Sequence, residues 1–120
     1  MAEFDSSQIP NRLIASIPIY FGAHGAILFA GDSVDLSLGG LYLKTELPLN
    51  LGERIYLNIN LPTLDDAVSC EGKVAWVNPS LASSKPHFPS GVGVEFVHLT
   101  SNVEEEIKRF INWRTPREST

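Results

Sequence analysis

The sequence contains a single cysteine, Cys70, and it lacks any long run of apolar residues. One cysteine cannot form a disulfide within the chain, which is typical of proteins in a reducing compartment. No apolar run approaches the roughly 20 residues that a membrane-spanning helix needs. The start of the chain is acidic and is not followed by the apolar stretch of a secretory signal. These absences predict a cytoplasmic protein with no membrane insertion.

Lysine and arginine are also scarce, nine against 14 aspartates and glutamates, and the net charge at pH 7 is −5. This balance argues against DNA or RNA as a partner, because such binding rests largely on phosphate neutralisation by basic side chains. A small anionic ligand stays compatible with the charge, because one or two arginines can bind it locally. The 120 residues, 43% of them hydrophobic, predict one globular domain with a single core.

Residues that would support catalysis or metal binding are not grouped in the sequence. His24, His87 and His98 are far apart, with no cysteine or carboxylate at metal-ligand spacing. Cys70 has no histidine partner suggested by the sequence, and no serine lies in a Gly-x-Ser-x-Gly motif. We therefore predict that the protein is not an enzyme and has neither a metal site nor a resident cofactor.

Short runs of alternating and β-branched residues, separated by turn signals, predict six β-strands. They lie near residues 17–21, 26–30, 41–45, 55–61, 68–76 and 91–97. Pro18 indicates that the first is an edge strand or begins at the proline. In the fifth strand, Gly72 suggests a bulge or a bend at a barrel corner. The residues expected to face the interior are Ile55, Leu57, Ile59, Val74 and Trp76.

The last part of the chain has the pattern of one amphipathic helix. Ser101 and Glu104 have the spacing of a capping box, and Thr115-Pro116 is expected to end the helix. Its apolar stripe consists of Val103, Ile107, Phe110 and Ile111. The pattern predicts an all-β fold, a six-stranded antiparallel β-barrel with a C-terminal helix over an opening or a flank. Residues 1–11 are expected to form an arm, 78–90 a mobile loop and 115–120 a tail.

The sequence Asp35-Leu36-Ser37-Leu38-Gly39-Gly40 joins two of the predicted strands and has the pattern Asp-x-Ser-x-x-Gly. In an extended backbone Asp35 and Ser37 point to the same side. The two glycines allow a sharp turn and a close approach to bare peptide N–H groups. Taken alone, the stretch is most simply a turn capped by its own serine, and it is also consistent with a ligand site.

The whole pattern resembles the PilZ domain family. The segments that carry the resemblance, over about residues 8–113, are Arg12, 17–19, 35–41, 52–55, 72–78 and 91–96. This resemblance implies a six-stranded barrel with a C-terminal helix, here over residues 12–114. In many members it also implies binding of the bacterial second messenger cyclic di-GMP.

The family's binding site has two parts, Asp-x-Ser-x-x-Gly and Arg-x-x-x-Arg, and they are unequally present. The implied ligand-binding positions are Gln8, Arg12, Asp35, Ser37, Gly39 and Gly40. Arg12 stands for the second arginine, whereas Gln8 occupies the place of the first. A guanidinium can bind a guanine edge with two hydrogen bonds and offset a phosphate charge. Gln8 can hydrogen-bond but cannot neutralise charge, and this loss costs roughly 1.5–3 kcal/mol.

Two functions follow from the resemblance. In the first, the chain would be a cyclic di-GMP receptor of reduced affinity, whose arm folds over the barrel on binding and signals to a partner protein. Alternatively, it is a degenerate PilZ adaptor that binds a motility, pilus or regulatory protein without any nucleotide. The complete Asp35-x-Ser37-x-x-Gly40 pattern favours the receptor, and the missing arginine favours the adaptor.

Overall fold

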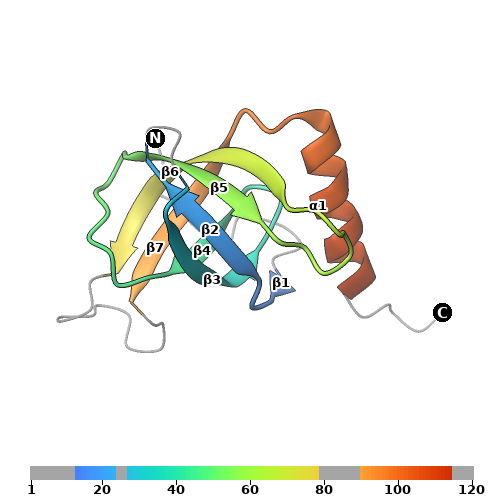
Figure 1. The fold of residues 1–120 in the computed structure, drawn as a ribbon, viewed down its shortest axis with the longest axis horizontal. Coiled ribbons are helices and arrows are strands. Elements are labelled where there is room, and N and C mark those ends of the chain that lie inside the picture. Colours follow the sequence, from blue (N-terminus) through green and yellow to red (C-terminus); the bar gives the residue numbers. More distant parts are fainter. Residues whose placement is uncertain (1–12, 24–26, 79–89, 115–120) are drawn as a thin grey trace.

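A computed structural model describes residues 13–23, 27–78 and 90–114 of the chain. These residues form seven antiparallel strands and one helix (Figure 1). The elements are β1 (Leu13–Ile14), β2 (Pro18–Gly22), β3 (Phe29–Leu36), β4 (Gly40–Lys44), β5 (Arg54–Ile59), β6 (Val68–Asn78), β7 (Gly91–Val97) and α1 (Ser101–Arg114). The arm, the tail and nearly all of the loop expected at 78–90 lie outside the described residues.

Six of the strands close into a barrel, as the sequence predicts. The order around the ring is β3-β2-β5-β6-β7-β4, and β4 pairs with β3 to complete it. The seventh, β1, is only two residues long and pairs with the C-terminal end of β3. Since β1 and β2 lie against the same strand, they behave as one strand with a break at residues 15–17.

The break between β1 and β2 is held together by one buried serine. Ser33 Oγ accepts a hydrogen bond from Ile17 N at 3.0 Å and donates one to Ala15 O at 2.6 Å. These two bonds replace ladder contacts that the break removes, so the two buried backbone groups both have partners. These two hydrogen bonds explain how the polar side chain of Ser33 is accommodated at a buried position of β3.

Two expectations about the strands were wrong. The second strand was expected at 26–30, but β3 extends from Phe29 to Leu36 because polar residues at its C-terminal end, Ser33 and Asp35, form hydrogen bonds there. The edge-strand alternative for Pro18 is also wrong, since β2 pairs with both β3 and β5. Pro18 is instead the first residue of its strand, where a missing N–H is tolerated.

Most of the predicted interior is confirmed. Ile55, Leu57, Ile59 and Val74 are completely buried, and the polar residues between them on β5 face outward. They pack with apolar residues from all six strands of the barrel. Burial of this many branched side chains provides the main driving force for the fold.

The expectation that Trp76 faces the interior is wrong. The register between β6 and β7 shifts between Val74 and Trp76, so the bulge lies at Ala75 and not at Gly72. One extra residue reverses the side to which all later residues of a strand point. Trp76 is consequently opposite Gly93 on the outside of the barrel and is only partly buried.

Helix α1 lies at one end of the barrel (Figure 1). Its predicted stripe of Val103, Ile107, Phe110 and Ile111 is buried, which confirms the expected covering role. The N-terminal cap is Thr100, one residue before the predicted Ser101, because Thr100 Oγ1 accepts the hydrogen bond of Val103 N at 3.2 Å.

The described residues contain no helix that is long and apolar enough to cross a bilayer. Among the same residues, no three histidine, cysteine, aspartate or glutamate side chains are grouped as metal ligands would be. His98, the one described histidine, is exposed in the loop between β7 and α1.

Candidate ligand-binding face

The Asp-x-Ser-x-x-Gly stretch forms the tight connection between β3 and β4. Ser37 N donates to Gly40 O at 2.9 Å, which closes the turn. Ser37 Oγ accepts from Gly39 N at 3.1 Å and donates to Gly40 O at 3.3 Å. The serine therefore caps its own turn, and this structural role is observed directly.

Gly40 is required by packing as well as by the turn. A Cβ on Gly40 would overlap the carbonyl of Val94 on the neighbouring strand β7. Gly39 O in turn accepts a hydrogen bond from Phe96 N at 2.9 Å. The turn is thus attached to β7 at two successive residues, and its shape does not depend on a ligand.

One sequence-based expectation about the turn needs correction. The Gly39 amide was expected to be bare and available to a ligand, but it donates to Ser37 Oγ. Asp35 and Ser37 are also almost completely buried, at 1% and 0% exposure. Of the four predicted site positions in this turn, only Gly39 is partly exposed.

Asp35 connects the turn to the outer face of the barrel. Its Oδ1 accepts a hydrogen bond from Tyr42 N at 3.2 Å across the bulge between β3 and β4. Tyr42 lies between the core residues Leu41 and Leu43, so its ring points to the outside of the barrel. The acid of the motif therefore sits directly beside an aromatic residue on β4.

Tyr42, Trp76 and Gly93 form an aromatic shelf across β4, β7 and β6. The ring centroids of Tyr42 and Trp76 are 5.2 Å apart, in a tilted arrangement. Gly93 leaves room for the indole, because a Cβ there would overlap the Trp76 ring. The bulge at Ala75, the glycine on β7 and the Tyr42 ring together fix where Trp76 lies.

Asn78 forms a hydrogen bond with the hydroxyl of Tyr42. Asn78 Nδ2 donates to the Tyr42 hydroxyl oxygen at 3.3 Å, and both side chains are buried. Burial raises the pKa of Tyr42, with the nearby Asp35 adding to the rise, while the hydrogen bond from Asn78 works in the opposite direction. The hydroxyl therefore stays neutral at physiological pH.

The structure brings part of the predicted site together. Asp35, Ser37, Gly39 and Gly40 form one turn at the end of the barrel wall. Gln8 and Arg12 lie outside the described residues, but β1 shows where the arm meets the barrel: Leu13 pairs with Leu36 and Ile14 with Asp35. The chain therefore enters the barrel directly beside the motif.

Sequence reasoning missed the aromatic shelf. Tyr42 was read only as part of a strand, and Trp76 was assigned to the core. The signals were a tyrosine between two leucines and a tryptophan downstream of a β-strand glycine, which do not by themselves reveal a bulge. Only the strand registers place both rings on the same outer face as Asp35.

Comparison with known proteins gives two kinds of match. The family model described as PilZ domain matches residues 11–113. None of the curated proteins compared with the chain matches it.

Among solved structures, the inhibitor of motility MotI/DgrA of Bacillus subtilis is similar, with a TM-score of 0.68 and 17% identity over 86% of this chain. That match spans only 48% of the motility inhibitor, about half its length. The PilZ domain of CeSA from a cellulose-synthesizing bacterium is also similar, with a TM-score of 0.61 and 18% identity over 85% of this chain and 95% of that one. At these identities the likeness shows a shared fold.

Proposed function

The chain belongs to the PilZ domain family, and we propose that it is a cyclic di-GMP receptor that transmits the level of this second messenger to a partner protein. The family is one of binding and adaptor domains, in which cyclic di-GMP is the ligand. The proposal places the ligand on the outer face formed by the arm, the β3–β4 turn and the aromatic shelf.

The observation that carries the proposal is the pairing of β1 with the end of β3. Because Leu13 pairs with Leu36, the described part of the chain begins beside the Asp35–Gly40 turn, and Arg12 is the residue before Leu13 in the sequence. In the proposed site, a cation and a carboxylate would thereby be supplied to one small surface from two distant parts of the sequence. That is the combination that a guanine edge and a phosphate require.

Each group has a role that its chemistry suits. Arg12 would bind a guanine edge or a phosphate through its planar guanidinium. Asp35 would accept hydrogen bonds from the N1–H and N2–H of guanine, which requires its buried carboxylate to become accessible on binding. The Trp76 indole, partly exposed and braced by Tyr42, offers a flat face on which a base can stack.

We expect the affinity to be modest, since Gln8 supplies no positive charge where a second arginine would stand. The Gly39 amide already donates a hydrogen bond to Ser37 Oγ. These two residues would therefore contribute the shape of the site more than new hydrogen bonds to the ligand. Binding would draw the arm onto the barrel, and this change in shape would be read by the partner. We propose that this takes place in the cytoplasm and involves no cofactor.

Calorimetric titration of the full chain with cyclic di-GMP at low salt tests the proposal. We expect measurable binding by the wild type and none by Arg12→Ala, because the first 43 residues contain no other lysine or arginine to replace it. Arg109→Ala, which removes an arginine from the exposed side of α1, is the matched control and should bind like the wild type. Equal binding by Arg12→Ala would place the ligand elsewhere.

The burial of Asp35 and Ser37 favours the alternative function. Both side chains already have partners around the turn, so the motif is fully explained as a structural element. In that case the chain is an adaptor that docks a protein of motility or pilus control without nucleotide. The fold shared with an inhibitor of motility is consistent with such a partner. A folded wild type that does not bind cyclic di-GMP at low salt would establish the adaptor over the receptor.

A further inference from the structure

The outer face of β2, β5 and β6 carries two exposed tyrosines. Tyr20 on β2 is 48% exposed and Tyr56 on β5 is 39% exposed. Leu28, 74% exposed, lies just before β3 at the edge of the same surface, where its N–H bonds to Phe21 O. We call the surface around Tyr20, Tyr56, Asn58 and Ser69 the tyrosine face.

The tyrosine face has small residues beside its large side chains and a groove next to Tyr56. Gly22 lies opposite Tyr56, and Ala30 lies opposite Tyr20. Between Tyr56 and β6 runs a groove of about 390 Å³, lined by Ile27, Tyr56, Leu57, Asn58, Ser69, Cys70 and Glu71. A hollow next to raised aromatic rings is a shape that can interlock with another protein surface.

Two charged side chains of opposite sign next to Tyr56 form an ion pair. Arg54 precedes Tyr56 by two residues on the same side of β5, and Glu71 lies directly opposite Tyr56 on β6. Arg54 Nη1 and Glu71 Oε2 are 2.9 Å apart, and both side chains are partly exposed. The two charges of this pair cancel, and Lys73 lies opposite Arg54 on β6, so the area around Tyr56 is not acidic, on a chain whose net charge is −5.

This arrangement is complementary to itself. In a two-fold symmetric contact, each residue near the axis meets its counterpart across it. An axis that passes near Tyr56 brings the two Tyr56 rings together and sets Arg54 of each copy against Glu71 of the other. An exposed intramolecular ion pair is worth little, so exchanging it for an intermolecular pair costs little. The acidic remainder of the surface would otherwise keep two copies apart.

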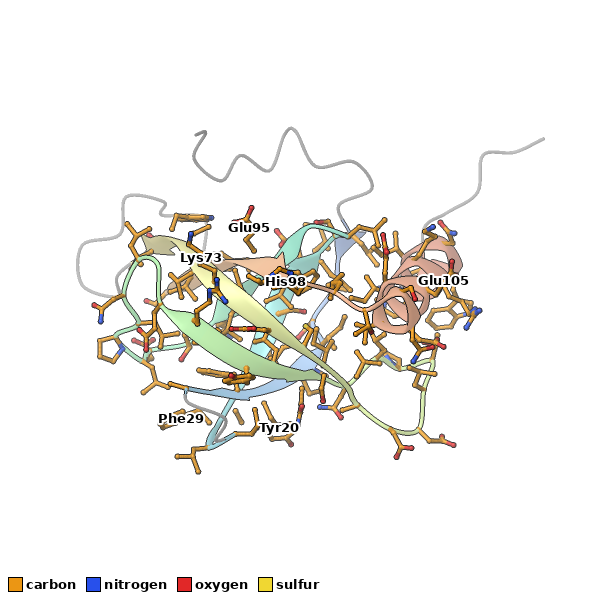
Figure 2. The ribbon with its side chains drawn as sticks, turned by 90° about the horizontal axis from the view of Figure 1, so that it is seen from above. Tyr20, Phe29, Lys73, Glu95, His98 and Glu105 are labelled. Carbon is orange, nitrogen blue, oxygen red and sulfur yellow. The ribbon has the colours of Figure 1, made fainter. Side chains whose placement is uncertain are left out.

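We propose that a second copy of this chain docks on the tyrosine face, forming a symmetric dimer. The inference goes beyond the nucleotide function and does not depend on it. In the closed ring, β4 is three strands away from β5 in either direction, and Figure 2 shows Tyr20 on the side of the barrel away from Glu95 of β7. The dimer therefore leaves both aromatic shelves open to a ligand.

Sedimentation equilibrium of the full chain over a wide range of concentration is the first test. We expect a monomer–dimer equilibrium in the wild type. Tyr56→Ser should weaken the association by at least about tenfold, as loss of a central aromatic residue does at interfaces. Leu51→Ser removes an exposed apolar side chain from the loop between β4 and β5, which is not among the residues that define the tyrosine face, and should leave the association unchanged.

Charge reversal is the second test, and it addresses the symmetry. In a homodimer, Arg54→Glu sets two carboxylates against each other at each contact, because the partner's Glu71 is unchanged. Glu71→Arg likewise sets two guanidinium groups against each other, so each variant alone should be monomeric. In an equimolar mixture of the two variants, each contact joins either the two new side chains or the two original ones, and both contacts then pair opposite charges. The mixture should therefore form a heterodimer, and circular dichroism checks that each variant is folded.

Three results would overturn the proposal: a wild type that is monomeric at every concentration, a dimer that Tyr56→Ser does not weaken, or a mixture of the charge variants that remains monomeric. The first would leave the tyrosine face to a different protein.

Discussion

The aromatic shelf on β4, β6 and β7 and the tyrosine face on β2, β5 and β6 both carry aromatic rings, but they hold them in different ways. On the first, Tyr42 is completely buried, bonded to Asn78 and in contact with Trp76. On the second, Tyr20 and Tyr56 project into solvent beside small neighbours. The rings of the first face are held in place by contacts within the protein. The rings of the second face are exposed to solvent and remain available for contact with another molecule.

The difference bears on what each face can bind. A small ligand gains affinity when the groups that contact it are already ordered, because less freedom is lost on binding. The aromatic shelf, built on a bulge and a glycine, meets that condition. A protein partner instead needs exposed anchors that become buried on association, and the tyrosine face supplies them.

The largest expected difference between the two faces is in the free energy of unfolding that is lost when one tyrosine on each face is truncated. Tyr42→Ala removes a buried ring and its hydrogen bond, and should lower the free energy of unfolding by roughly 3–5 kcal/mol. Tyr56→Ala removes a ring that solvent already reaches, and should cost less than about 1 kcal/mol. Denaturant unfolding at a concentration where the chain is monomeric measures both. Equal losses would show that the two faces are not built differently.

An arginine at position 8 should change ligand binding at the proposed cyclic di-GMP site without changing the tyrosine face. Gln8→Arg restores the Arg-x-x-x-Arg spacing with Arg12, and should raise the affinity for cyclic di-GMP about ten- to a hundredfold. The gain should shrink at higher salt, since part of it is Coulombic. Gln8→Lys supplies charge without the planar fork and should gain less. Self-association should not change in either variant, and no binding by any of them would favour the adaptor.

The smallest effect concerns the partly buried thiol of Cys70, which lines the groove of the tyrosine face. Burial raises the pKa of Cys70 from 9.0 to about 12. The stability that the neutral thiol contributes is therefore fully present below pH 9 and is lost as the pH rises toward 12. At pH 10 the loss is roughly 1 kcal/mol.

Unfolding free energies of wild type and Cys70→Ala at pH 8 and pH 10 measure this effect. We expect a smaller decline with pH in the variant, because it lacks the titrating thiol. Tyr42→Phe is the corresponding control for the opposite face, where the raised tyrosine pKa acts only above pH 10. Identical declines in wild type and Cys70→Ala would show that the thiol titrates normally in the folded chain.

Much of the fold follows from local patterns. The alternation of Ile55, Leu57 and Ile59 predicted both a strand and its buried side, and the spacing of Val103, Ile107 and Phe110 predicted the covered side of α1. These periods are properties of the backbone, so they can be read without knowing the neighbours of a strand or helix. The Asp-x-Ser-x-x-Gly turn was found for the same reason, since its residues are consecutive.

The position of Trp76 could not be predicted in that way. The bulge at Ala75 exists only in relation to β7, where β6 carries one residue more than its partner. A glycine at position 72 was the visible candidate for the irregularity, but it pairs in register with Ile55 and Phe96. The strand pattern was correct up to Val74 and reversed after it.

The amino-acid sequence by itself determined the family, the barrel, the helix stripe and the motif, because these depend on composition, period and consecutive residues. The tertiary structure alone decided that Asp35 and Ser37 are buried, that Trp76 packs on Tyr42 outside the barrel, and that two exposed tyrosines share a face with an ion pair. The physical reason is that burial and side-chain direction depend on how strands pair across the ring. That pairing joins residues far apart in the sequence, such as Gly40 with Glu95 and Leu13 with Leu36. No local sequence pattern indicates such a pair.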